Sequence, residues 1–179
     1  MGHLYFVRHG ESEWNVLKKI CGRTDIPLTQ KGREQAAITA AKILELGIRA
    51  DEILCSPLQR AKVTATVIAE ATGFPLREEP RLIEQHFGSF EGKSWATPEF
   101  IAAKQQFADD HDGGESNLRV AQRIYNLIDD IKPSGKTYIL VAHNGIVRSV
   151  QSYFHCETNE EYASFGIPNC DVVEYTWED

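Results

Sequence analysis

Long apolar runs are absent from this 179-residue chain. The longest, such as residues 139–142, are far shorter than the roughly 20 residues that a membrane-spanning helix needs, so we expect no contact with a membrane. The first residues also have no signal-peptide layout. We therefore expect a cytoplasmic protein.

Closely spaced cysteines are lacking as well. The four cysteines lie far apart and form no C-x-x-C pair: Cys21, Cys55, Cys156 and Cys170. Without an export signal they are expected to be free thiols. Zinc-ligand spacing is absent too, and the acidic stretch at 109–112 fits a solvated loop better than a metal site.

An excess of positive charge is the third absence. The formal net charge is −7, and an acidic protein is repelled by a phosphate backbone, so we expect no nucleic-acid partner. This balance still leaves room for a small basic pocket. The chain shows no repeat or linker-like stretch, and its length suits a single domain over residues 1–179.

Apolar periodicity and turn residues predict strands that alternate with helices. Strands are expected at 4–7, 51–55, 137–142 and 172–177. Helices are expected at 30–47, 57–73, 97–107, 116–131 and 144–154. Residues 76–92 are expected to be irregular, with strand-like pieces around 82–83 and 87–90. The alternation predicts an α/β fold, a three-layer α/β/α sandwich with a mainly parallel central sheet.

Two helices carry more detailed predictions. The helix at 57–73 is expected to start with a capping box in which Ser56 pairs with Gln59, with Pro57 at its first position. The helix at 30–47 is expected to bury one apolar face, made of Ala37, Ala40, Ala41 and Leu44.

Reactive polar residues follow three of the predicted strands. Arg8 and His9 follow the first strand, Arg60 lies shortly after the second, and His143 follows the strand at 137–142. Ligands of open α/β sheets bind at the carboxyl ends of the strands, so these side chains are expected to converge in one crevice. Two arginines and two histidines there suit a phosphate group.

These residues belong to an ordered set of motifs that resembles the histidine phosphatase superfamily, in its phosphoglycerate mutase-like branch. The resemblance covers nearly the whole chain in the order of the family. Its motifs are residues 8–15 (RHGESEWN), 22–29 (GRTDIPLT), Gly32, 56–61 (SPLQRA), 82–84, 87–88, 91–92, 114–116 (GES) and 142–145 (AHNG).

The resemblance implies a chemistry for these residues. His9 is expected to attack phosphorus as a neutral imidazole and to form a phosphohistidine, which water then hydrolyses. Glu84 is expected to act as the general acid and then as the general base. No metal or organic cofactor is implied. The residues expected to surround the phosphoryl group are Arg8, Asn15, Gly22, Arg60, His143 and Asn144.

Three departures separate the chain from the cofactor-dependent phosphoglycerate mutases that it is similar to. Phe87 stands where those enzymes have a tyrosine, and Trp95 stands where they have a lysine. The segment between Lys93 and the G-E-S motif is short and holds no arginine. A mutase must retain a doubly phosphorylated intermediate, for which distant cations are needed.

We therefore expect a phosphatase of the small phosphatase type, acting on a small phosphorylated metabolite. A phosphoglycerate mutase is the alternative within the enzymes. A non-catalytic phospho-ligand binder is the alternative from another class. A homodimer is left open, because nothing in the sequence decides the oligomeric state.

Overall fold

A five-stranded sheet with the order β3-β2-β4-β1-β5 forms the middle of the molecule. The computed structural model describes residues 2–178. The strands are β1 (Gly2–Arg8), β2 (Glu52–Cys55), β3 (Leu76–Glu78), β4 (Tyr138–Ala142) and β5 (Val172–Trp177). The first four run parallel to one another, and β5 pairs antiparallel with β1 at the sheet edge. The prediction of a mainly parallel sheet is confirmed.

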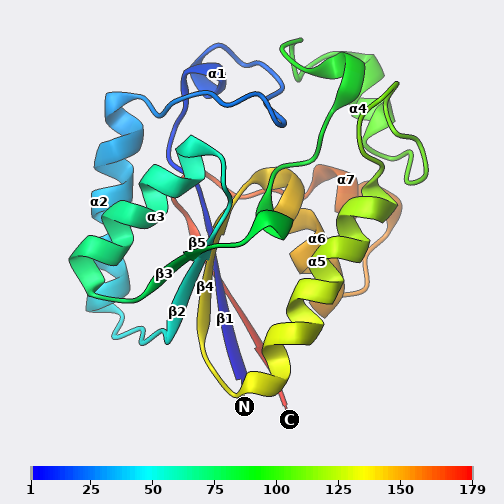
Figure 1. The fold of residues 1–179 in the computed structure, drawn as a ribbon. Helices are drawn as coiled ribbons and strands as arrows, with labels where there is room; N and C mark the ends of the chain where they lie inside the picture. The colour runs from blue at the N-terminus through cyan, green and yellow to red at the C-terminus, as the bar shows by residue number, and fades with distance from the viewer. Residues whose placement is uncertain (1, 179) are drawn as a thin grey trace.

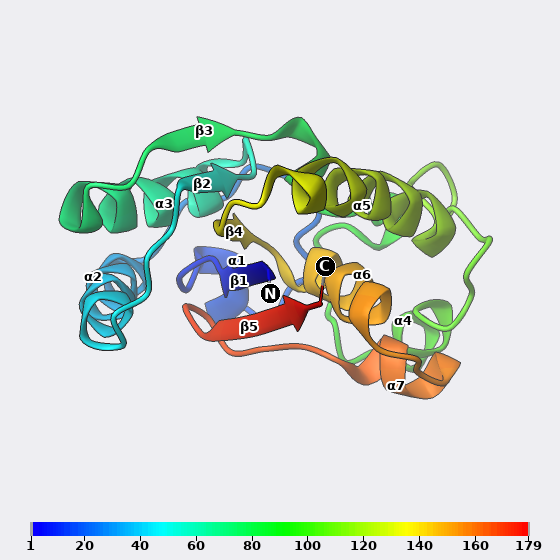
Figure 2. The same ribbon diagram turned by 90° about the horizontal axis from the view of Figure 1, so that it is seen from below.

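Helices cover both faces of this sheet. α2 (Gln30–Glu45) and α3 (Gln59–Thr72) lie on one face, whereas α5 (Asn117–Ile131) and α6 (Asn144–Phe154) lie on the other (Figure 2). Side chains of β4 alternate between two apolar cores, as the period-two geometry of a strand requires. Ile139 packs with the core of α2 and α3, whereas Leu140 packs with the core of α5 and α6. The predicted three-layer sandwich is thus confirmed.

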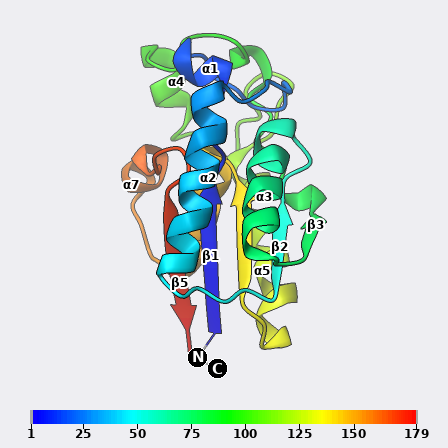
Figure 3. The ribbon, with the colours of Figure 1, turned by 90° about the vertical axis from the view of Figure 1, so that its left-hand side faces the viewer.

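Shorter helices complete the chain. They are α1 (Glu13–Val16), α4 (Pro98–Ala103), α7 (Asn159–Ser164) and three 3₁₀ turns at Pro80–Leu82, Gly88–Phe90 and Lys132–Ser134. α1 and α4 lie beyond the carboxyl ends of the parallel strands (Figure 1), and Figure 3 shows α1 above the tops of α2 and β1. None of the helices between residues 2 and 178 combines the length and hydropathy of a membrane span.

The predicted capping box of α3 is wrong. The helix begins at Gln59, with Leu58 as N-cap residue and no side-chain cap from within the element. Ser56 Oγ instead lies 2.7 Å from Nε2 of His143. The Gln59 N–H donates to the carboxylate of Asp25 at 2.8 Å, so a distant residue supplies the cap.

Other local predictions also need correction. The buried face of α2 is formed by Ala36, Ala40 and Ile43, while Leu44 is exposed, because the helix is rotated from the face that the alanine spacing indicated. The strand-like pieces around 82–83 and 87–90 are 3₁₀ turns or extended loop, and a short strand forms earlier, at β3. The helix predicted over 97–107 ends at Ala103.

Candidate active site

The register of the parallel strands brings two histidines together. Arg8, the last residue of β1, is paired with Ala142, the last residue of β4. The residues that follow these two strands are His9 and His143, and their ring centroids lie 5.1 Å apart. Adjacent parallel strands that end at the same level therefore place both imidazoles at one edge of the sheet.

His9 is buried and held in one tautomer. Its Nδ1 lies 2.7 Å from the carbonyl oxygen of Gly10, which can only accept, so Nδ1 carries the proton and Nε2 keeps its lone pair. Burial lowers the pKa of His9 well below its ordinary value, and the positive charges of Arg60 and Arg8 lower it further. The imidazole is thus neutral at physiological pH, which a histidine nucleophile requires.

His143 is fully buried and also neutral. Burial lowers its pKa well below the ordinary value, followed by the charge of Arg60. Ser56 Oγ accepts from the Leu58 N–H and lies within hydrogen-bond distance of Nε2 of His143. The Nδ1 atom of His143 has no partner within residues 2–178. If the Ser56 hydroxyl donates to Nε2, the Nδ1–H remains as a free donor.

Arg60 comes from the start of α3, and its charge acts on both histidines. It is fully buried, and its guanidinium donates to the carbonyls of Gly22 at 2.7 Å and Thr24 at 3.0 Å. Only its Nε lacks a partner among the described residues. Arg60 thus binds the 21–24 loop and acts on His9 through its charge, and it does not line the cavity described below.

Glu84 is buried beside the start of α6. Its carboxyl accepts from the N–H of Gln85 at 2.8 Å and from the N–H of Gly145 at 3.1 Å. Burial nevertheless raises the pKa of this carboxyl above its ordinary value, against the lowering by these bonds and by Arg60. A carboxyl with a raised pKa is suited to donate a proton, as the predicted role demands.

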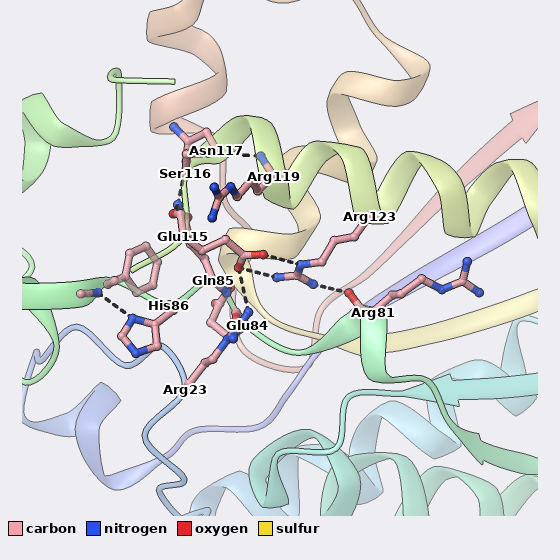
Figure 4. A network of polar contacts seen from close by, with 12 residues as sticks. Arg23, Arg81, Glu84, Gln85, His86, Glu115, Ser116, Asn117, Arg119 and Arg123 are labelled. Carbon is pink, nitrogen blue, oxygen red and sulfur yellow. Dashed lines mark hydrogen bonds and ion pairs between the residues drawn. The ribbon is translucent and has the colours of Figure 1, made fainter. Parts of the chain in front are cut away.

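A network of ion pairs holds the segment that carries Glu84 (Figure 4). The carboxylate of Glu115 accepts from Arg123 at 2.9 Å and from Arg23 at 3.1 Å. Arg123 also donates to the carbonyl of Arg81, and Arg23 donates to the carbonyl of Glu84 at 3.3 Å. These two arginines therefore fix the backbone at Arg81 and at Glu84 itself.

Two predicted binding residues line the cavity with side-chain amides. Asn15 accepts through Oδ1 from the Ser12 N–H and from Asn169, and its amide nitrogen makes no bond within residues 2–178. Asn144 is the first residue of α6 and accepts from the N–H of Ile167 at 3.0 Å. Both side chains leave N–H donors that could reach a bound anion.

Gly22 does not fit its predicted role. Its N–H donates to the Glu91 carboxylate at 3.2 Å, and the same carboxylate accepts from the N–H of Arg23 and the hydroxyl of Thr24. Gly22 also does not line the cavity. A Cβ on Gly22 would lie 2.0 Å from Glu91, so the glycine is required for this close approach.

The candidate site opens into a cavity of about 460 Å³. Five of the predicted residues line it, namely Arg8, His9, Asn15, Glu84 and Asn144, whereas the fully buried His143 does not. Sequence reasoning missed several further lining residues, which are Glu11, Lys19, Ile20, Phe100, Lys104, Gly145, Arg148 and Asn169. Two of these residues stand in motifs named above and could have been identified from them, Glu11 in residues 8–15 and Gly145 in residues 142–145.

Two other side chains also line the cavity. Trp95 borders it and is 40% exposed. Cys21 also lines the cavity, and burial raises the pKa of its thiol to about 11, which makes it a poor nucleophile. All four cysteines are free thiols. Between residues 2 and 178, no cluster of three or more histidine, cysteine or carboxylate side chains is arranged to hold a metal ion.

Comparison with known proteins gives the class of this chain. The family model of the histidine phosphatase superfamily (branch 1) matches residues 4–179. The chain is 35% identical over 152 residues to the probable phosphoglycerate mutase GpmB of Serratia proteamaculans (strain 568), covering 80% of this chain and 70% of the relative. The protein belongs to the histidine phosphatase superfamily.

Solved structures share the fold closely. A mycobacterial glucosyl-3-phosphoglycerate phosphatase is similar with a TM-score of 0.84 and 27% identity, over 97% of this chain and 89% of that chain. A phosphoglycerate mutase from Thermus thermophilus is similar with a TM-score of 0.77 and 31% identity, over 98% of this chain and 93% of that chain. The similar structures thus include both a phosphatase and a mutase by name.

Proposed function

We propose that this protein is a phosphatase that hydrolyses a small phosphomonoester through a phosphohistidine on His9, with Glu84 as general acid and base. The observation that carries the proposal is the pairing of a neutral His9, whose Nε2 is free, with a protonatable Glu84 in one cavity. Side-chain cations take the charge of the phosphoryl oxygens, so the reaction as proposed requires no metal ion.

The first step transfers the phosphoryl group. Nε2 of His9 attacks phosphorus, the ester P–O bond breaks, and the leaving oxygen takes the proton of Glu84. Arg8 would stabilise the charge that spreads over the equatorial oxygens. Burial lowers the pKa of Arg8 to about 10, so its guanidinium stays charged at neutral pH.

The second step hydrolyses the phosphohistidine. Glu84, now a carboxylate, takes a proton from water as the water oxygen attacks phosphorus, and the P–N bond to His9 breaks. Inorganic phosphate leaves, and both groups return to their starting protonation states. His143, whose Nδ1 has no partner within residues 2–178, would donate from Nδ1 to a phosphoryl oxygen in both steps in the tautomer in which the Ser56 hydroxyl donates to Nε2.

Phosphate release from a panel of phosphomonoesters, with excess chelator present, tests the proposal. We expect turnover in the wild-type protein and a loss of about ten-thousandfold or more in His9→Ala. The control is His155→Ala, which alters an exposed histidine after α6. Turnover that persists in His9→Ala, or that chelator abolishes and a divalent cation restores, would contradict the proposal.

A mutase is the second candidate, because the cavity holds cations that the sequence argument did not count. The segment between Lys93 and the G-E-S motif lacks arginine, yet it supplies Lys104, and Arg148 comes from α6. Exchange between 2- and 3-phosphoglycerate with 2,3-bisphosphoglycerate present, and little phosphate release, would favour this candidate. Absence of both activities would favour a non-catalytic phospho-ligand binder.

A further inference from the structure

The charge of the cavity differs from the charge of the chain. The chain has a net charge of −7, but four cationic side chains line the cavity: Arg8, Lys19, Lys104 and Arg148. Among residues 2–178, only two carboxylates line it. One is Glu11, which is already paired with Lys31 at 3.0 Å, and the other is Glu84, whose pKa is raised by burial. The cavity therefore carries an excess of positive charge.

Lys104 is the clearest unpaired cation of this set. It is half-buried at the end of α4 and forms no ion pair within residues 2–178. Its ammonium lies 5.8 Å from the ring centroid of Phe100, which also lines the cavity. The carbonyl of Lys104 accepts from Asn117 at 2.9 Å, so its backbone is fixed from α5.

Arg148 also lines the cavity, and its charge acts on both Lys104 and Glu84. Its Nε donates to the Phe165 carbonyl at 3.0 Å, and no carboxylate in the described part of the chain pairs with it. The pKa of Lys104 is lowered first by burial and then by the charge of Arg148, and Arg148 in turn interacts with Glu84. A repulsion between two unpaired cations is relieved when an anion binds between them.

Resting on the phosphatase proposed above, we propose that Lys104 and Arg148 form a second anion subsite, and that the substrate is a phosphomonoester that carries another anionic group. Arg8 and His9 receive the phosphoryl group, while the two distal cations receive a carboxylate or a second phosphate. The cavity volume of about 460 Å³ exceeds what one phosphoryl group fills, so there is room for both groups.

Matched substrates test the subsite. 3-Phosphoglycerate and glycerol 3-phosphate share the phosphoryl ester and differ by a carboxylate in place of a hydroxymethyl group. Fructose 1,6-bisphosphate and fructose 6-phosphate differ by a second phosphate. The first pair reports a carboxylate as the second anion, and the second pair reports a phosphate. We expect at least one anion-bearing member to have a kcat/KM about tenfold or more above its partner.

The variant Lys104→Met keeps the length of the side chain and removes its charge. It should raise KM for the preferred anion-bearing substrate about tenfold and leave kcat/KM for its partner within about twofold. Lys136→Met, an exposed lysine before β4, is the control and should change neither. Equal losses on both members of the pair, or no loss on either, would overturn the subsite while leaving the phosphatase intact.

A binding measurement separates this proposal from the proposed activity. Calorimetric titration of His9→Ala with the same ligand pairs should show tighter binding of an anion-bearing member, and this preference should vanish in His9→Ala/Lys104→Met. That result would support the subsite even if no phosphomonoester is turned over. Equal binding of both members, or binding of neither, would contradict it.

Discussion

The two ends of the cavity are assembled from different kinds of structure. The inner end consists of Arg8, His9 and Glu84. Arg8 ends β1 and His9 follows it, and the register of β1 is set by its parallel pairing with β4. The outer end consists of Lys19, Trp95 and Lys104, which lie after α1, in a loop and at the end of α4. Strand ends hold reacting groups rigidly, whereas short helices and loops offer side chains that select a ligand.

This difference predicts two kinds of mutational effect. Changes at the inner end should reduce turnover for every substrate, because they alter the groups that are proposed to act on the phosphoryl group and the leaving oxygen. Changes at the outer end should alter the choice among substrates and leave the chemistry in place, as expected for Lys104.

Among the variants that keep His9, Glu84→Gln should cause the largest loss of kcat. We expect kcat on alkyl phosphates to fall by about 10²- to 10⁴-fold, because the leaving alkoxide loses its proton donor. An activated aryl phosphate needs less protonation and should lose less. Steady-state kinetics on both ester types provides the measurement, and equal losses would argue against Glu84 as the acid.

Gly145→Ala tests whether the position of the Glu84 carboxyl matters. A Cβ on Gly145 would lie 2.2 Å from Oε1 of Glu84, so the carboxyl must move. We expect kcat to fall by about 10- to 100-fold, since small displacements of a catalytic group are costly. Thermal unfolding should show a folded protein, because alanine favours a helix over glycine. An unchanged kcat would mean that the placement of this carboxyl is not critical.

The smallest expected effect concerns stability and pH. The pKa of His143 is low in the folded protein and about 6.5 in the unfolded chain, so its contribution to stability is complete above pH 6.5 and is lost as the pH falls. At pH 5.5 this residue should lower the unfolding free energy by on the order of 1 kcal/mol. Glu84, whose folded pKa is raised, acts in the opposite direction and adds stability at low pH.

Urea unfolding at pH 7.5 and 5.5 measures this contribution. The drop in unfolding free energy should be smaller in His143→Gln than in the wild type, while Glu84 and His9 contribute to both proteins alike. The exposed His155→Gln should retain the full drop. If His143→Gln keeps the wild-type pH dependence, the imidazole of His143 is not held neutral in the folded state.

Much of the fold could be predicted from the sequence, because its elements carry local signals. The strand at β4 is a run of strongly apolar residues, and α5 shows an apolar face at helical spacing. The errors fall where local signals compete with tertiary contacts. Ser56 has the sequence context of a helix cap, but its Oγ forms a hydrogen bond with Nε2 of His143 instead, and Asp25 provides the cap for Gln59.

The candidate site divides in a similar way. Motif spacing identified Arg8, His9, Glu84 and Asn15, and the structure brings all four to one cavity. Gly22 and Arg60 were expected as phosphate ligands as well, yet Glu91 engages the N–H of Gly22, and Arg60 binds carbonyl groups of the 21–24 loop. No pattern in a single sequence shows which partners already occupy a donor.

By itself, the sequence determined the order of strands and helices, the presence of two histidines at strand ends and the family of the chain. These depend on periodicity, turn residues and short motifs, which are local along the chain. Only the tertiary structure decided which cations face the cavity, because Lys104 and Arg148 are 44 residues apart in sequence and reach the same cavity from the end of α4 and from α6. The charge of a cavity is a property of folded surfaces, and the net charge of the chain does not predict it.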